Sequence, residues 1–157
     1  HDGVPSVYFF SLDAQGLASV VGARLFHHLP YYYARISLEQ TDGCVQFSSR
    51  RRHPGARPGQ YEATYRPIGE SFAAPSDPLA EFLVERYRFY TEAPDGSVRY
   101  TDVRHEPWTL YPAEANVETD TLLRASGFAR PDSAPVYYYS PGVDVVASRS
   151  NELEGRR

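Results

Sequence analysis

The chain has 157 residues, enough for one domain that buries about 70% of the surface exposed by its unfolded form. All 16 basic residues are arginine, and the formal net charge of −4 gives no general attraction for nucleic acid or an anionic membrane. Lysine is absent, so no side-chain lysine imine can form, and the single Cys44 excludes an intrachain disulfide and a cysteine-based zinc site. No stretch reaches the roughly 18 apolar residues of a membrane span, and we expect a cytoplasmic protein.

The first third of the chain is predicted to form a strand, a helix and a hairpin. Residues 4–12 are β-branched and aromatic and predict a strand, after which Asp13 would cap a helix over residues 15–28 that ends before Pro30. The apolar stripe that this helix would bury comprises Leu17, Val20, Val21, Leu25 and Leu29. Residues 31–40 and 44–51 flank Asp42-Gly43, a strong signal for a β-hairpin, and residues 60–68 predict a third antiparallel strand.

The remainder of the chain alternates short helices with further hairpins. Asp77-Pro78 predicts the start of a second helix, and its predicted buried stripe comprises Leu79, Phe82, Leu83 and Arg86. Residues 87–91 and 97–105 predict a hairpin, and residues 109–117 predict a strand that leads to a short helix over residues 119–125. Residues 136–140 are predicted to pair with residues 143–148 across Pro141-Gly142.

This order of elements predicts an α+β fold. We expect a mainly antiparallel, curved β-sheet or partly closed β-barrel with two or three peripheral helices, because closure removes exposed strand edges. Neither a βαβ repetition nor an internal sequence repeat is present. We expect residues 1–150 to form one domain and residues 151–157 to form a polar tail.

The histidines do not suggest a metal centre, and no cofactor motif is present. His27 and His28 are neighbours that would point about 100° apart on a helix, unlike an i, i+4 ligand pair. His53 and His105 carry no metal-like spacing. A nucleophile elbow, a P-loop and a G-x-G-x-x-G loop are all absent. We therefore expect neither a metal nor a cofactor.

The densest basic cluster is the run from Arg50 through Arg51 and Arg52 to His53, with Arg57 nearby. It has two interpretations: an anion or phosphate site at one end of the sheet, or a solvated hairpin end with alternate arginines on opposite faces. The acidic net charge favours the solvated end, and we expect no nucleic-acid binding.

Polar residues also occur inside otherwise apolar strands, at Arg35, Tyr65, Arg66, Arg104 and His105. An arginine in a sheet either reaches solvent or pairs with a carboxylate inside a cavity. Facing inward with the tyrosines, such residues would line an aromatic pocket for a small acid. Structural salt bridges would produce the same pattern.

Several segments resemble YqjF-like proteins, a conserved bacterial family of unknown function in the acetoacetate decarboxylase-like superfamily. They are YFFSLDA (8–14), GAR (22–24) with LPY (29–31), ATYRP (63–67), FLVERY (82–87), DVRH (102–105) with PW (107–108), and YSPGVDV (139–145). The resemblance implies a curved sheet or β-barrel with a central cavity and peripheral helices. It also implies that this chain lacks an N-terminal segment that supplies one wall of the cavity.

The resemblance also identifies a chemical departure. Acetoacetate decarboxylases form an imine through a lysine in a pattern like G-R-x-x-x-x-P-K-K. The matching stretch here runs from Gly22 through Arg24 to Pro30, and the place of the lysine is taken by Tyr31 or Tyr32. A phenol forms no imine, so this chain does not decarboxylate by that mechanism.

The main functional hypothesis is therefore a barrel cavity that binds a small organic molecule, in particular one with a carboxylate. Its candidate lining residues are Tyr31, Tyr33 and Arg35, which share one strand face, and then Tyr65, Arg104 and His105. One alternative is a lyase or hydrolase that acts on a small acid with His105 or a tyrosine as acid or base. Another is an assembly domain that forms homo-oligomers through exposed strand edges.

Overall fold

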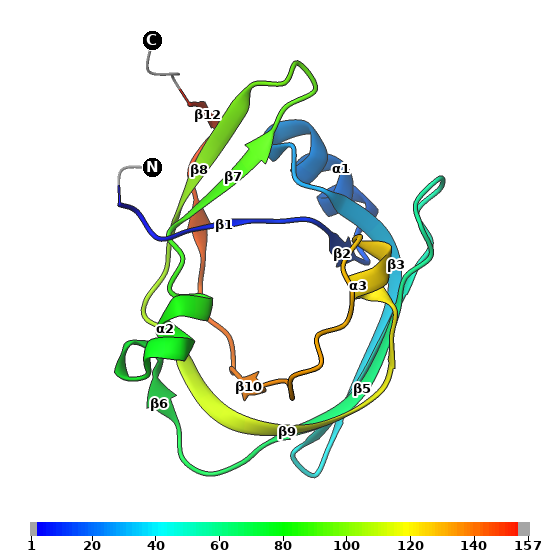
Figure 1. The fold of residues 1–157 in the computed structure, drawn as a ribbon, viewed down its shortest axis with the longest axis vertical. Helices are drawn as coiled ribbons and strands as arrows, with labels where there is room; N and C mark the ends of the chain where they lie inside the picture. The colour runs from blue at the N-terminus through cyan, green and yellow to red at the C-terminus, as the bar shows by residue number, and fades with distance from the viewer. Residues whose placement is uncertain (1–2, 154–157) are drawn as a thin grey trace.

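Two curved sheets close most of a ring in the structure of the chain, a computed structural model that describes residues 3–153 (Figure 1). The larger sheet contains, in order, β10 (Tyr138–Tyr139), β9 (Thr109–Asp120), β5 (Gln60–Pro67), β4 (Cys44–Arg51), β3 (Tyr31–Thr41) and β2 (Leu12–Ala14), with β6 (Phe72–Ala73) also paired to β9. The smaller sheet contains β1 (Ser6–Tyr8), β7 (Arg88–Glu92), β8 (Val98–Arg104) and β11 (Val146–Ala147), with β12 (Asn151–Glu152) also paired to β8.

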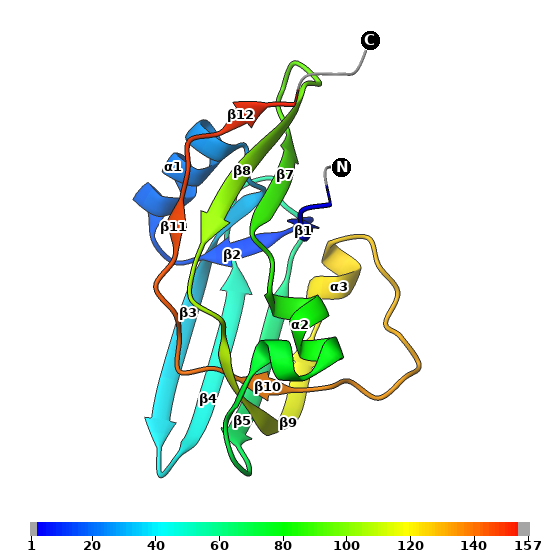
Figure 2. The same cartoon turned by 90° about the vertical axis from the view of Figure 1, so that its left-hand side faces the viewer.

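Three helices accompany the sheets: α1 (Leu17–His27), α2 (Pro78–Val84) and α3 (Leu122–Ala125), with a short 3₁₀ turn at Ala74–Ser76. Figure 2 shows α1 beside the smaller sheet and α2 next to the loop that leads into β7. The predicted fold class is confirmed: the sheets are mostly antiparallel, strongly curved and accompanied by three helices.

The central hairpin forms as its sequence predicts. β3 and β4 pair in antiparallel register from Ala34 opposite Arg51 to Thr41 opposite Cys44. The two turn residues between them take positive φ angles, 50° at Asp42 and 76° at Gly43, which aspartate tolerates and glycine adopts without strain.

The N-terminal segment differs from its prediction because it belongs to both sheets. Instead of one strand over residues 4–12, β1 pairs in parallel with β7, and β2 pairs in parallel with β3. β2, α1 and β3 thus form one βαβ connection in an otherwise antiparallel sheet. Figure 1 shows this part of the chain crossing from one sheet to the other.

The two longer helices begin near their predicted starts but bury different residues. α1 is preceded by Gly16 rather than capped by Asp13, which lies in β2. Of its predicted stripe only Val20 and Leu29 are buried. The Asp77 side chain does cap α2, accepting the Ala80 N–H at 2.8 Å. The predicted stripes were wrong for the residues that the structure exposes, namely Leu17, Val21, Leu25, Leu79, Phe82 and Leu83.

The C-terminal part of the chain is also paired differently. The hairpin predicted across Pro141-Gly142 is absent from the described structure, because β10 pairs with β9 while β11 pairs with β8. Each segment thus joins a different sheet. Residues Asn151–Glu152, expected to belong to a polar tail, pair with Tyr100 and Arg99 of β8, and residues 154–157 of that tail lie outside the described residues.

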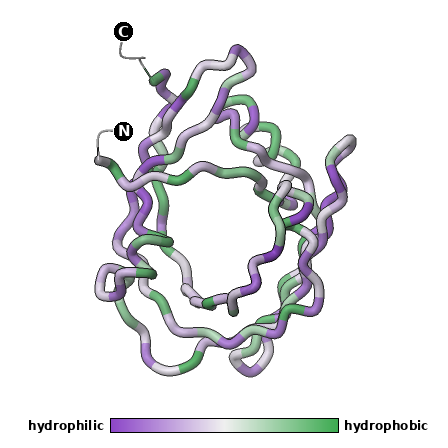
Figure 3. The backbone as a smooth tube through the Cα atoms, in the orientation of Figure 1, coloured by the Kyte–Doolittle hydropathy of each residue, from purple (hydrophilic) through white to green (hydrophobic). Residues whose placement is uncertain are grey.

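The buried core is small for a chain of this size. The accessible surface is 10,889 Å², whereas a compact monomer of 17.7 kDa exposes about 8,000 Å². Figure 3 shows hydrophobic stretches along α1 and α2, where Phe26 is 72% exposed and Phe82 is 67% exposed. Among the residues described, no helix is long and apolar enough to cross a membrane.

Candidate functional site

One face of the larger sheet carries a group of charged and aromatic side chains that come from separate strands. Strand pairing places Asp13 of β2 opposite Tyr32 of β3, and Arg51 of β4 opposite Ala34 of β3. Tyr32 and Ala34 are two residues apart, so their side chains point to the same side of the sheet. Asp13, Tyr32 and Arg51 therefore meet on one face.

Arg51 forms a buried ion pair on this face. Its Nε donates to Oδ1 of Asp13 at 2.8 Å, and its Nη2 donates to Oγ of Ser11 at 2.5 Å. The side chains of Arg51 and Asp13 are only 3% and 8% exposed. The guanidinium lies over the ring of Tyr32, 4.2 Å from its centroid, in a cation–π contact. Three contacts thus hold the Arg51 guanidinium in place.

A pocket of about 510 Å³ opens beside this ion pair, and we call it the arginine pocket. Its lining residues are Phe10, Arg24, Tyr32, Arg51, His53, Pro54, Gly55, Ala56, Arg57, Ala125 and Ser126. Three of these are arginines, and Asp13 behind the wall neutralises one of them. The pocket therefore carries excess positive charge.

Three further contacts hold the wall of the arginine pocket in place. Arg24 of α1 donates from Nη1 to the Tyr31 carbonyl at 2.8 Å, and its guanidinium lies 5.9 Å from the centre of the Tyr32 ring. His53 accepts the backbone N–H of Tyr33 at Nδ1, 3.1 Å away, so the neutral ring carries its proton on Nε2 and can donate it.

A second pocket, of about 320 Å³, lies between α2 and the smaller sheet, and we call it the aromatic pocket. Its lining residues are Val7, Phe9, Leu83, Val84, Arg86, Arg88, Phe89, Val103, His105, Trp108 and Val145. Behind it, the buried carboxylate of Glu85 accepts the Trp108 backbone N–H at 2.9 Å and the phenol O–H of Tyr87.

Tyrosine pKa values shift upward wherever a shift is resolved among the described residues. The hydrogen bond to Glu85 raises the pKa of Tyr87 to about 12, and burial raises the pKa of Tyr61, Tyr65 and Tyr138. These four phenols stay protonated at neutral pH, so they are hydrogen-bond donors rather than bases.

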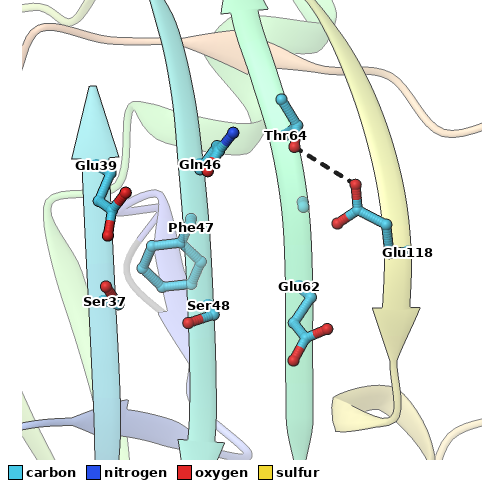
Figure 4. A pocket seen from close by; sticks show the side chains of 9 residues that line it. Ser37, Glu39, Gln46, Phe47, Ser48, Glu62, Thr64 and Glu118 are labelled. Carbon is cyan, nitrogen blue, oxygen red and sulfur yellow. Dashed lines mark hydrogen bonds between the residues drawn. The ribbon is translucent and has the colours of Figure 1, made fainter. Parts of the chain in front are cut away.

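The opposite face of the larger sheet is polar and holds a third hollow, of about 350 Å³ (Figure 4). It contains three carboxylates, Glu39, Glu62 and Glu118, and Oγ1 of Thr64 donates to Glu118 at 3.4 Å. Within residues 3–153, no group of three or more His, Cys, Asp or Glu side chains is arranged to hold a metal ion. This acidic hollow is unsuited to an anionic ligand.

The residues selected from the sequence are divided between these surfaces. Tyr31, Tyr33 and Arg35 do share one face of β3, as alternation predicts, but it is the face opposite Tyr32. Arg35 is exposed there. Their role in binding stays a prediction.

The second group of sequence candidates is also divided. Tyr65 lies on the Tyr32 face but further along the sheet, with its ring 6.5 Å from that of Tyr139. His105 lines the aromatic pocket, and Arg104 is exposed. The structure thus brings only one of the six candidates into either pocket.

Sequence reasoning missed the Asp13–Arg51 pair, since the two residues are 38 positions apart and Asp13 resembles a helix cap. Alternation did give a signal, because the run at 50–52 predicts arginines on opposite faces. Arg50 and Arg52 are exposed while Arg51 is buried, as the solvated-hairpin interpretation expects for alternate residues. Anion binding at this cluster stays a prediction.

Comparison with known proteins gives a family and a fold. A family model named DUF2071 and described as an uncharacterized conserved protein matches residues 1–144. The Uncharacterized protein YqjF of Bacillus subtilis (strain 168) is 39% identical over 146 residues, which are 93% of this chain and 59% of that protein. The chain thus spans less than two thirds of the length of this relative.

Among solved structures, acetoacetate decarboxylase from Legionella pneumophila superposes with a TM-score of 0.55. The match covers 90% of this chain and 58% of that one, at 12% sequence identity, and so concerns the fold alone. The chain therefore belongs to the DUF2071 family of YqjF-like proteins and has an acetoacetate decarboxylase-like fold.

Proposed function

We propose that the chain binds a small organic anion, such as a carboxylate, in the arginine pocket, and does so without imine chemistry. The observation that carries this proposal is the arrangement of Arg24, Arg51 and Arg57 around one pocket, where Asp13 is the one carboxylate ion-paired with any of them among the described residues. A bound anion would compensate the remaining positive charge.

The chemistry of the wall suits a planar carboxylate. An arginine offers its N–H groups as a rigid fork that matches two carboxylate oxygens, and it keeps its charge at all physiological pH values. Arg51 is already oriented by Asp13 and Tyr32, so little side-chain freedom remains to be lost when a ligand binds. Nε2–H of His53 adds a neutral donor.

The resemblance to acetoacetate decarboxylases favours the same pocket. The superfamily lysine is replaced here by Tyr31 or Tyr32, and Tyr32 lines the arginine pocket. The solved neighbour is by name an enzyme for a small keto acid. Since no lysine is present, we propose retention of an acid-binding site without the reaction that the lysine performs.

A thermal-shift screen with small carboxylates and β-keto acids, and with inorganic phosphate for comparison, tests this proposal. A ligand at 100 times its Kd stabilises by about 2.7 kcal/mol, which raises Tm by roughly 5–10 °C for a domain of this size. Arg57→Gln is expected to weaken binding about 10-fold or more, since one charge-assisted hydrogen bond contributes about 1.5–3 kcal/mol.

Arg52→Gln is the matched control, because Arg52 is exposed on the same segment and does not line the pocket. It should leave the affinity unchanged. If both variants lowered the affinity equally, the loss would reflect a general change in charge rather than a contact in the pocket. A screen without any anion-dependent shift in Tm would contradict the proposal.

A second proposed role is assembly through α1, and the exposed apolar side chains of that helix favour it. Leu17, Val21, Leu25 and Phe26 are each more than half exposed. Contiguous exposed apolar surface marks association sites. We expect a second copy of the chain to cover this face, in addition to any pairing through strand edges.

Sedimentation velocity at increasing protein concentration checks this expectation. The average mass should rise with concentration, and the double variant Leu25→Glu, Phe26→Glu should remain monomeric. Val98→Glu, which places the same charge on an exposed valine of β8, is the control and should still associate. A wild-type chain that stays monomeric throughout would exclude this role.

A further inference from the structure

We propose that the aromatic pocket is a separate ligand site, which takes a small neutral molecule with an apolar body and a hydroxyl that donates to Nε2 of His105. It differs from the arginine pocket in its location, lining and charge.

The size and lining of the aromatic pocket define the apolar body. Its volume of about 320 Å³ lies at the low end of the range of roughly 300–1,000 Å³ for small-molecule sites. A helix about 10–12 Å across does not fit such a volume, so the occupant is a small molecule rather than a partner helix. Aromatic rings of Phe9, Phe89 and Trp108 contribute to the wall, which favours a flat or compact apolar ligand.

His105 supplies an acceptor in a defined orientation. Its Nδ1 lies 2.8 Å from the backbone carbonyl oxygen of Glu106. A carbonyl only accepts, so Nδ1 carries the proton and Nε2 of the neutral ring is left as an acceptor. The ring is stacked on Tyr87, with centroids 4.7 Å apart and planes 17° apart. It meets the Trp108 ring in an edge-to-face arrangement, with centroids 5.7 Å apart.

Two other charged groups around the pocket, Glu85 and Arg88, are already occupied. Glu85 accepts from both Tyr87 and the Trp108 backbone, and Arg88 is paired with Asp102 at 2.7 Å. Among the hydrogen bonds of the described residues, none engages Nε2 of His105. This nitrogen is therefore the acceptor that remains for a ligand.

The local charge disfavours an anionic ligand. Glu81, Glu85 and Glu106 lie close enough to Tyr87 that each contributes to raising its pKa. Arg86, whose guanidinium packs over the ring of Phe82 at 4.5 Å, is the one cation of the pocket wall that is not paired with a carboxylate among the described residues. Three carboxylates near Tyr87 thus outnumber the one unpaired arginine of the wall, the reverse of the balance in the arginine pocket.

Fluorescence of Trp108 tests this inference directly, since it is the only tryptophan of the chain and lines the pocket. Titration of the full chain with benzyl alcohol should change the emission in a saturable way, and benzoate should bind more weakly. Toluene measures the apolar contribution without the hydroxyl. The ratio of the benzyl alcohol and toluene affinities should fall about 2–10-fold in His105→Phe, as expected for one lost hydrogen bond.

His53→Phe is the matched control, because it changes a histidine of the arginine pocket and should leave this ratio unchanged. If His105→Phe fails to fold, Val103→Phe serves instead: it fills the pocket and should abolish the response of Trp108 to both probes. The inference is overturned if neither probe gives a saturable response, if benzoate binds as tightly as benzyl alcohol, or if His105→Phe leaves the ratio unchanged. Loss of anion binding in Arg57→Gln leaves each of these readouts intact, so the two sites succeed or fail separately.

Discussion

Replacement of Arg51 by methionine is expected to lower the free energy of unfolding by about 3–5 kcal/mol, one of the two largest effects that we predict for a single substitution. The reason is that Asp13 would remain as a buried charge without its partner, with its side chain only 8% exposed. For a domain of this size the loss corresponds to a Tm lower by roughly 6–20 °C. Urea denaturation at neutral pH measures it.

Two control substitutions separate the effect of losing a buried ion pair from the effect of losing a positive charge. Arg50→Met removes the neighbouring exposed arginine and should change stability by less than about 0.5 kcal/mol. Arg66→Met breaks an ion pair with Glu114 whose side chains are 63% and 59% exposed, and should cost about 0–1 kcal/mol.

The double variant Asp13→Leu, Arg51→Met should recover much of the stability, because an apolar pair replaces both buried charges. If Arg51→Met were no more destabilising than Arg66→Met, the Asp13–Arg51 pair would not be desolvated in solution.

Replacement of Glu85 by alanine is expected to cost about 3 kcal/mol or more, since two charge-assisted hydrogen bonds of about 1.5–3 kcal/mol each are lost. The Trp108 backbone N–H and the Tyr87 O–H, both partly buried, would be left without this acceptor. Glu81→Ala is the matched control in α2, because Glu81 is exposed, and it should be nearly neutral. Equal stability of the two variants would contradict a structural role for Glu85.

The same carboxylate gives the fold a dependence on alkaline pH. The folded-state pKa of Tyr87, about 12, lies above the unfolded value of about 10, so the folded state holds this proton more tightly. The resulting stability is complete below pH 10 and is lost as the pH rises through 12. The difference between the spectroscopic titrations of wild type and Tyr87→Phe should show a phenol with a pKa near 12. The substitution Glu85→Gln should lower this pKa. An unchanged titration in Glu85→Gln would assign the shift to another cause.

The two pockets are separate and differ in their charge and in the polarity of their walls. The arginine pocket is polar and cationic, whereas the aromatic pocket is lined mainly by apolar side chains, with carboxylates nearby around Tyr87. Both are assembled from segments far apart in the chain. One scaffold can therefore hold the two proposed sites, one for an anion and one for a neutral molecule, without sharing a side chain between them.

Local signals in the sequence determined the elements whose ends are set by residues close together in the chain. The hairpin at Asp42-Gly43 depends on two residues that accept positive φ, and α2 begins where Asp77 caps and Pro78 follows. The absence of lysine from these 157 residues excluded a side-chain lysine imine within them, without any reference to structure. The resemblance over nearly the whole chain gave the family and the fold class.

Only the tertiary structure decided which partner each short segment takes and which face of each element is covered. β1 and β2 read as one strand, and β10 and β11 read as a hairpin, because the choice between two sheets depends on distant strands that local propensity does not encode. The same holds for the helices, whose apolar stripes indicate a face but not whether the described chain covers it. In the sequence Asp13 resembles a helix cap, but in the structure strand pairing places it beside Arg51. A buried charge is stabilised by the partner that the fold brings to it, and this partner is not evident from the neighbouring residues in the sequence.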